Sequence, residues 1–435
     1  MKHWMIVTLF VLILSQPGLK AQNLYFPPTL GDTWETVSPE SLGWCTPEID
    51  PLLNFLEQEN SKAFIVLKDG KIAIEKYFGT FTKDSLWYWA SAGKTLTAFL
   101  VGQAQEDGLL SIGDSTSKYL GVGWTGLTPE QERKITIRHQ LTMTTGLDDG
   151  LEDNHCTLDS CLQFLAEPGT RWAYHNAPYT LLEKVLTNAS GSAINAFTRE
   201  NLLSPTGMTG LWLTVDYDNV FFSKPSSMAR FGLLVQNSGV WNKDTLLKDR
   251  DYFNAMINTS NEINQSYGYL WWLNGKPNYM LPGVQFVFNG SWAPDAPADM
   301  FAAMGKNGQM LCIVPSQGLV VVRMGNPGDS PLSEIGVFLC NMIWQKLNAV
   351  ICSETVVEDI EFDTGDLCVF PNPSKGEITI HGYEGHAEIF NTSGLKVWQG
   401  IVLHGQPVSL KHLPAGFHLL KTCSGSFKFM LNPNR

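Results

Sequence analysis

The sequence predicts an α+β fold in which helices flank an antiparallel sheet, followed by a small C-terminal all-β sandwich. Strand patterns stand at both ends of the central region with helical patterns between them, so we expect the two ends to complete one sheet. The final stretch, 366–435, consists of short alternating strands and turn residues. A length of 435 residues exceeds one ordinary domain, which agrees with more than one folded unit.

Composition narrows the class of protein. Hydrophobic residues make up 44% and charged residues 17%, which excludes a disordered or fibrous chain. The 30 basic and 42 acidic side chains give a formal charge of −12, which argues against a nucleic-acid partner. No glycine-rich phosphate loop opens a helix, and no histidine and cysteine cluster has metal-ligand spacing, so we expect no cofactor and no metal.

The first 21 residues have the pattern of a secretory signal peptide. Lys2 precedes the apolar run from Trp4 to Leu14, and Ala21 is a small residue suited to cleavage. The alternative is a membrane anchor, but an anchor needs about 20 apolar residues to cross a bilayer. No later segment has that length and character, so we expect an exported chain with no membrane span.

Two hairpins and a helix define the central sheet. Ala63–Leu67 and Ile72–Tyr77 are apolar runs separated by an Asp-Gly turn, which is typical of a hairpin. Met310–Val314 and Leu319–Met324 form a second predicted hairpin. A helix is predicted over Ser333–Leu347, with its first residue as the N-cap.

Ser91 and Lys94 lie at the predicted start of another helix, because apolar residues recur at helical spacing after them. Residues three apart share one face of a helix, so the two side chains can touch. A serine hydroxyl becomes a nucleophile when a base takes its proton, and a partly desolvated lysine can be that base. Helix N-terminal amides would favour an oxyanion at the same place. The alternative is a serine N-cap before a solvated lysine.

A Tyr-x-Asn triplet follows, with Tyr174 placed 83 residues after Ser91 and Asn176 two residues later. Side chains two apart in an extended loop point to the same side. A phenol near a lysine can pass a proton to a leaving group. Standing alone, the triplet would be interpreted as a buried aromatic residue with a turn asparagine.

These two motifs, in this order and at this separation, resemble those of the serine β-lactamase and penicillin-binding-protein superfamily, above all its class C and esterase-like branch. The resemblance covers roughly residues 50–345 of a predicted domain at 22–350, and it implies a β-lactamase/transpeptidase-like fold. Further similar segments are Ile135–His139, Leu141–Leu147, Met228–Gly232 and Tyr267–Trp272.

The resemblance also implies roles for single residues. Ser91 would be the acylated nucleophile, Lys94 the base and Tyr174 the proton shuttle, while Asn176 would orient the substrate amide or Lys94. The backbone amides of Ser91 and Lys306 would form the oxyanion hole. The implied chemistry is two-step acyl transfer with water as the final acceptor.

One departure from the superfamily concerns the substrate. The third motif, Lys-Thr-Gly or His-Thr-Gly, falls by register at Ala303–Gly305. Ala303 supplies no cation to hold a carboxylate, a group that β-lactams and peptidoglycan stem peptides both carry. A neutral ester or amide therefore fits better, although the Lys306 side chain could still reach the pocket.

Other candidates for the pocket wall are Trp271, Trp272, Ala303 and Gln309. One of the two adjacent tryptophans is expected in the core, because neighbours in an extended segment point to opposite faces. With lysine as the base, His139 and His175 are not needed for catalysis. The acidic residues of 148–153 are expected to form a solvated loop rather than a cation site.

Export would permit disulfides. Cys156 and Cys161 lie five residues apart, and we expect them to close a local loop, with two unpaired thiols as the alternative. The other six cysteines are scattered, and the sequence does not pair them.

The C-terminal region begins after an acidic stretch, 351–365, that has five acidic residues and no basic one and is interpreted as a linker. Glu377–His381 and Ala387–Asn391 then alternate as strands.

Three segments of 366–435 resemble a type IX secretion sorting domain: Pro371–Pro373, Asn391–Gly394 and Leu413–Gly416. Such a domain implies the type IX secretion machinery as a partner and passage through the outer membrane of a Gram-negative bacterium. The protein would be secreted or attached to the cell surface. A carbohydrate-binding or adhesive module is the alternative.

Three functions remain open from the sequence. The favoured one is a secreted serine hydrolase acting on a small ester or amide. The second is a β-lactamase or peptidoglycan D-Ala-D-Ala carboxypeptidase. The third is a catalytically silent binding protein with the same fold.

Overall fold

The computed structural model describes residues 24–151, 153–328, 336–352, 368–391, 395–403, 405–422 and 426–432. The predicted signal peptide lies outside the described residues, as do Ser333, most of the predicted linker, Thr392–Gly394 of the tail motif, and Cys423.

A six-stranded antiparallel sheet in the order β2-β1-β13-β12-β11-β8 forms the centre of the fold. Its strands are β1 (Ser61–Lys68), β2 (Lys71–Tyr77), β8 (Trp272–Leu273), β11 (Phe301–Gly305), β12 (Gln309–Val314) and β13 (Leu319–Gly325). β1 pairs with β13, with Ile65 opposite Val322, so the two ends of the region do complete one sheet. The predicted α+β fold class is confirmed.

Both predicted hairpins form within this sheet. Asp69 and Gly70 connect β1 to β2 with φ of 50° and 85°, and two positive values match the twist of paired strands. A side chain at Gly70 would collide with the backbone carbonyl of Tyr25, so glycine is required there for space as well.

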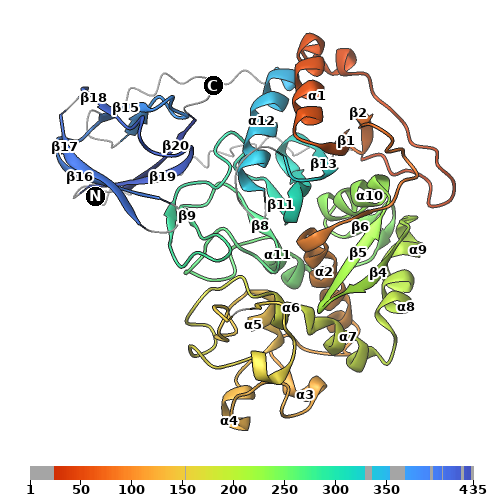
Figure 1. The fold of residues 1–435 in the computed structure, drawn as a ribbon. Helices are drawn as coiled ribbons and strands as arrows, with labels where there is room; N and C mark the ends of the chain where they lie inside the picture. The colour runs from red at the N-terminus through yellow and green to blue at the C-terminus, as the bar shows by residue number, and fades with distance from the viewer. Residues whose placement is uncertain are drawn as a thin grey trace, which may run out of the picture.

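Helices cover both faces of the sheet (Figure 1). The long ones are α1 (Ile49–Gln58), α2 (Lys94–Glu106), α10 (Pro225–Gln236) and α12 (Val337–Ile351). Cys340 of α12 lies 3.7 Å from Cys312 of β12, whereas a Cβ at Gly232 of α10 would touch Leu311. Adjacent strand residues point to opposite faces, so α10 and α12 lie on opposite sides.

Between β2 and β8 the chain forms a mainly helical region next to the sheet (Figure 1). Its remaining helices are α3 (Ser117–Leu120), α4 (Pro129–Glu132), α5 (Ile137–Leu141), α6 (Asn176–Thr180), α7 (Leu182–Ser190), α8 (Ile194–Thr198), α9 (Ser204–Thr206) and α11 (Arg250–Met256). Its strands are β3 (Trp87–Tyr88), β4 (Gly210–Val215), β5 (Asp218–Ser223), β6 (Val240–Trp241) and β7 (Asp244–Thr245), and β9 (Asn278–Tyr279) and β10 (Phe288–Asn289) follow β8. Helix α2 is buried from Lys94 to Ala104, which makes it the central helix of this region.

The C-terminal part has two small sheets, β14-β15-β18 and β17-β16-β19-β20. Their strands are β14 (Cys368–Phe370), β15 (Glu377–His381), β16 (Gly385–Asn391), β17 (Lys396–Val402), β18 (Pro407–Ser409), β19 (Gly416–Lys421) and β20 (Ser426–Leu431). Ile380, Ile389 and Phe429 belong to one apolar core that both sheets share. This arrangement agrees with the predicted small β-sandwich.

Two disulfides cross-link the described chain. Cys156 is bonded to Cys161, the pairing expected from their spacing. Cys45 is bonded to Cys352, which ties the segment before α1 to the residue after α12. In the part of the chain that the structure describes, no helix is both long enough and apolar enough to cross a membrane.

Candidate active site

Ser91 lies in a short 3₁₀ turn, Ala90–Gly93, that leads directly into α2. Ala90 has a φ of 47°, a left-handed conformation that costs a non-glycine residue about 1–2 kcal/mol. Trp89 anchors the turn from the other side, because its indole donates a hydrogen bond of 2.7 Å to Ser223 Oγ. The turn is thus fixed on both sides of Ser91, a residue that remains partly exposed.

Lys94 is the point at which the two predicted motifs meet. Its Nζ donates to Ser91 Oγ at 3.0 Å and to Asn176 Oδ1 at 2.8 Å. The rings of Tyr174 and Tyr179 lie 5.2 and 4.1 Å from Nζ, measured to their centroids. Lys94 is only 4% exposed, so these groups surround the amine in place of water.

Tyr174 is held by an aromatic cluster. Its ring stacks on Trp272 at 6.0 Å and meets Trp172 and Tyr267 at 6.4 and 6.3 Å. These three residues are fully buried. The cluster fixes the position of the phenol that the sequence predicts as a proton shuttle.

Asn176 begins α6 and links Lys94 to Asn154 and His155, two residues to which the sequence assigned no role. Its Nδ2 donates to Asn154 Oδ1 at 3.1 Å and lies 3.2 Å from His155 Nε2. On the other side of the imidazole, His155 Nδ1 lies 2.7 Å from Asp218 Oδ2. Two side chains of the loop therefore contact the amide that contacts Lys94.

A cavity of about 490 Å³ opens onto this arrangement. It is lined by Ser91, Asp153, His155, Tyr174, Asn176, Asp216, Tyr217, Asp218 and Lys306. Three aspartates thus face one exposed lysine, Lys306, so the wall is mainly acidic.

The end of β11 lies directly against the turn that holds Ser91. A Cβ at Gly305 would come within 3.1 Å of the Ser91 nitrogen and 2.9 Å of the Ala92 nitrogen. Only glycine lets the strand come this close, and Lys306 follows it immediately. This placement agrees with the register that assigns the third motif to Ala303–Gly305 and puts the residue before Lys306 beside Ser91.

The four further pocket candidates lie away from the cavity wall. Trp271 and Trp272 are 0% and 1% exposed, and Trp272 contacts the site only through Tyr174. Ala303 is fully buried in β11, which pairs on both sides. Gln309 instead joins two strands, accepting from the Gly325 amide at 3.0 Å and donating to its carbonyl at 2.6 Å.

His139 and His175, the two histidines considered in the sequence analysis, lie outside the cavity and are largely buried. His139 Nδ1 accepts from the Thr136 amide at 3.1 Å, capping α5, and burial lowers its pKa. Burial also lowers the pKa of His175, to about 4. Neither lines the cavity.

The acidic loop differs in part from the expectation of a solvated segment. Arg171 pairs with Asp149 at 2.6 Å, and Asp153 faces the cavity. Over the described residues, no group of three or more histidine, cysteine, aspartate or glutamate side chains is placed to hold a metal ion.

Sequence reasoning missed His155 and Asp218. They lie 63 residues apart, in a loop and at the start of β5, and no spacing rule connects them. The one local signal was that His155 directly precedes a cysteine of the predicted loop disulfide.

Comparisons with known proteins agree with this fold. An uncharacterised protein of Alkalihalophilus pseudofirmus is 24% identical over 304 residues, 61% of this chain and 84% of the relative. A solved structure from Bacillus anthracis, described as a candidate 6-aminohexanoate-dimer hydrolase, superposes with a TM-score of 0.52 at 19% identity, over 68% of this chain and 81% of that one. A penicillin-binding-protein homologue from Caulobacter crescentus gives a TM-score of 0.54 at 13% identity, over 74% and 99%.

The profile of the Beta-lactamase family matches residues 56–334, a range that contains Ser91, Lys94, Tyr174 and Asn176. With the sheet, the serine–lysine pair and this match in agreement, the chain belongs to the β-lactamase family of serine hydrolases.

Proposed function

We propose that this chain is an exported serine hydrolase that cleaves small neutral esters or amides through an acyl-enzyme on Ser91. The observation that carries the proposal is the position of Lys94 Nζ, 3.0 Å from Ser91 Oγ and 2.8 Å from Asn176 Oδ1, beside an open cavity. A base within hydrogen-bond reach of a serine is what nucleophilic catalysis requires.

The reaction has two steps. In the first, neutral Lys94 takes the proton of Ser91, whose Oγ attacks the substrate carbonyl carbon. The backbone amides of Ser91 and Lys306 stabilise the resulting oxyanion. Tyr174 gives its phenol proton to the leaving alcohol or amine as the bond from that group to carbon breaks, and it takes a proton back from Lys94. In the second step, Lys94 takes a proton from water, the water oxygen attacks the acyl carbon, and the proton returns to Ser91 Oγ as the bond from Oγ to carbon breaks, which releases the carboxylic acid and restores Ser91.

The charge of the cavity wall supports a substrate without a carboxylate. Asp153, Asp216 and Asp218 line the cavity, and like charges within one site repel. Ala303 adds no cation from β11. The family relationship leaves both esters and amides open, and the Bacillus anthracis neighbour is described as a candidate 6-aminohexanoate-dimer hydrolase.

Lys306 favours a second candidate, a β-lactamase or peptidoglycan carboxypeptidase, because its side chain is a cation on the cavity wall. The two candidates differ in the substrate that they turn over. The test measures hydrolysis of p-nitrophenyl acetate, a p-nitroanilide and nitrocefin by the wild-type protein and by Ser91→Ala. We expect Ser91-dependent turnover of the ester, with nitrocefin hydrolysed far more slowly. Rapid Ser91-dependent hydrolysis of nitrocefin would overturn the preference for neutral substrates, and equal turnover by Ser91→Ala would overturn the mechanism.

We also propose that the protein is exported and delivered to the outside of a Gram-negative cell by type IX secretion. The resemblance of the tail to a sorting domain supports this, and two disulfides suit an oxidising compartment. In a host with a type IX system, the full chain should reach the medium or cell surface, and a chain lacking 366–435 should remain in the periplasm. Equal delivery of both chains would contradict the sorting role.

A further inference from the structure

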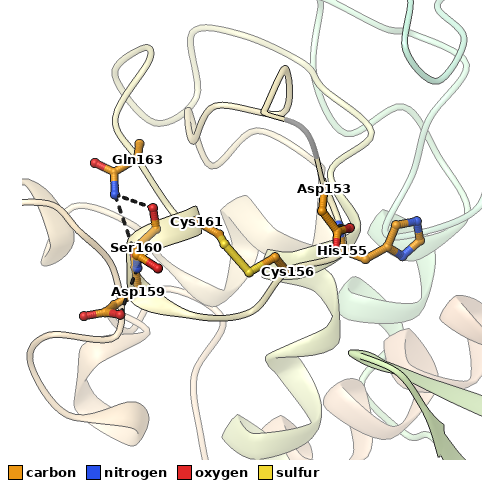
Figure 2. The surroundings of a disulfide bond; sticks show 7 residues. All are labelled: Asp153, His155, Cys156, Asp159, Ser160, Cys161 and Gln163. Carbon is orange, nitrogen blue, oxygen red and sulfur yellow. Dashed lines mark hydrogen bonds between the residues drawn. A yellow bond between two sulfur atoms is a disulfide. The ribbon is translucent and has the colours of Figure 1, made fainter.

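The loop before the Cys156–Cys161 disulfide brings a histidine to the site. Figure 2 shows His155 and Asp153 at one end of the disulfide, with Gln163 and Asp159 at the other. The His155 backbone amide donates to Asp153 Oδ1 at 2.9 Å, and the sulfur of Cys156 is tied to Cys161. The backbone on both sides of His155 is therefore held in place.

The contacts of His155 define one arrangement of protons. Asp218 Oδ2 lies 2.7 Å from Nδ1, so Nδ1 carries the hydrogen and donates it to the carboxylate. Nε2 then has a free lone pair, and it accepts from Asn176 Nδ2 at 3.2 Å. Burial raises the pKa of Asp218, but the hydrogen bond from His155, together with its other basic and hydrogen-bonding neighbours, outweighs burial, so that the pKa is lowered overall and Asp218 stays an acceptor.

The amide of Asn176 can take two orientations that exchange its oxygen and nitrogen. In the observed one, Nδ2 faces two acceptors, Asn154 Oδ1 and His155 Nε2, and Oδ1 faces Lys94. In the exchanged one, the NH₂ group would face the Lys94 amine, and the oxygen would face Asn154 Oδ1. Acceptors on the loop thus decide which atom Lys94 meets.

We propose that His155, held in its Nδ1–H form by Asp218, is a positioning residue that keeps the Asn176 amide oxygen on Lys94. It does not touch the reacting atoms. If Nε2 were protonated, it would be a donor facing the Asn176 NH₂ group, which is also a donor. The observed amide orientation would then keep only one of its two hydrogen-bond acceptors, Asn154 Oδ1. This inference rests on the proposed function, because it concerns the amine that activates Ser91.

Several charges surround the imidazole. Asp153 comes from its own loop, and Asp216 and Asp218 come from the β4–β5 hairpin. Lys94 of α2, Lys306 after β11 and His175 before α6 are the neighbouring basic groups, and burial lowers the pKa of His175 to about 4, so His175 is neutral near pH 7. His155 is exposed at the cavity, so solvent protons reach it.

The test compares His155→Leu with His155→Gln by ester turnover across pH. Leucine removes both hydrogen bonds, and we expect kcat to fall about 10- to 100-fold with KM within about threefold of wild type, since misplacing a catalytic group has an effect of this size. Glutamine offers an amide oxygen to Asn176 and an NH₂ group to Asp218, so it should rescue most of kcat.

His386→Leu is the matched control, because His386 is exposed on β16 of the C-terminal sheets. Melting temperatures of all variants show whether the fold is retained. Equal losses in His155→Leu and His155→Gln, or a His155→Leu variant as active as wild type, would overturn the positioning role. Absence of turnover and of Ser91 labelling in the wild-type protein would instead overturn the proposed function, and the inference with it.

Discussion

At the scale of single residues, the site depends on one buried amine with defined partners. Lys94 contacts the Ser91 hydroxyl on one side and the Asn176 amide oxygen on the other, and the rings of Tyr174 and Tyr179 lie beside it. No other described lysine lies at hydrogen-bond distance from Ser91 Oγ. The catalytic claim can therefore be tested by changing this amine alone.

Lys94→Met keeps the length of the side chain and removes the base. General-base catalysis contributes about 10²- to 10⁴-fold, so we expect kcat/KM for p-nitrophenyl acetate to fall by that range. Lys243→Met is the control, because Lys243 is exposed in a turn between β6 and β7. A Lys94→Met variant that folds and retains wild-type kcat/KM would show that another group activates Ser91.

The aspartates of the cavity wall predict a preference for substrates without a negative charge, and replacing one aspartate with a neutral residue should weaken that preference. Asp216→Asn removes one negative charge at a left-handed position, φ 54°, which asparagine tolerates well. Screened interactions across the cavity amount to about 0.5–1 kcal/mol. We expect kcat/KM for a carboxylate-bearing ester to rise about two- to fivefold, with little change for its neutral methyl ester. An equal change for both esters would mean that charge is not the cause.

At the scale of elements, the site exists because one strand end and one helix start come together. β11 reaches the Ser91 turn only because Gly305 has no side chain. The aromatic cluster around Trp272 of β8 packs against the ring of Tyr174 and fixes its position. The distance between these elements would control the geometry of the proposed oxyanion hole.

Gly305→Ala tests that close approach. The new Cβ would lie 2.5 Å from the Trp89 carbonyl oxygen, so β11 or the turn must shift. We expect kcat to fall about 100-fold, because an oxyanion donor is displaced, while the melting temperature changes by a few degrees. Ala302→Gly, on the same buried strand but without a new atom, is the control. Wild-type kcat in Gly305→Ala would contradict the placement of Lys306 beside Ser91.

The sequence predicted those parts of the fold that local chemistry determines. The hairpin at Asp69–Gly70 follows from residues that accept positive φ, and the Ser91–Lys94 contact follows from helical spacing. The contact between His155 and Asp218 depends on how a loop meets β5, and no local pattern specifies it. The same holds for Gln309, a polar residue expected at the pocket that bonds to β13 instead.

At the scale of the whole molecule, the ends of the catalytic region are held together covalently as well as by the sheet. Cys45 and Cys352 are 307 residues apart in sequence, and their bond closes nearly the whole region into one loop. Cys156–Cys161 closes a loop with a separation of only 5. The entropy removed from the unfolded chain increases with loop length.

Replacing both Cys45 and Cys352 with serine should lower the free energy of unfolding by about 6 kcal/mol, and replacing Cys156 and Cys161 by about 2 kcal/mol. Loss of the Cys45–Cys352 disulfide should therefore lower the melting temperature, measured by differential scanning calorimetry, more than loss of the Cys156–Cys161 disulfide. The second replacement should reduce kcat more, because His155 directly precedes Cys156. The reverse order of melting temperatures would contradict the entropic explanation.

The central claim is that Ser91 is an activated nucleophile, and covalent labelling tests it most directly. A fluorophosphonate probe should add one adduct mass to the intact wild-type protein, on the peptide that contains Ser91, and none to Ser91→Ala. Labelling should slow strongly in Lys94→Met. A wild-type protein that takes up no probe, or a Ser91→Ala variant that is labelled as fast as wild type, would contradict the account.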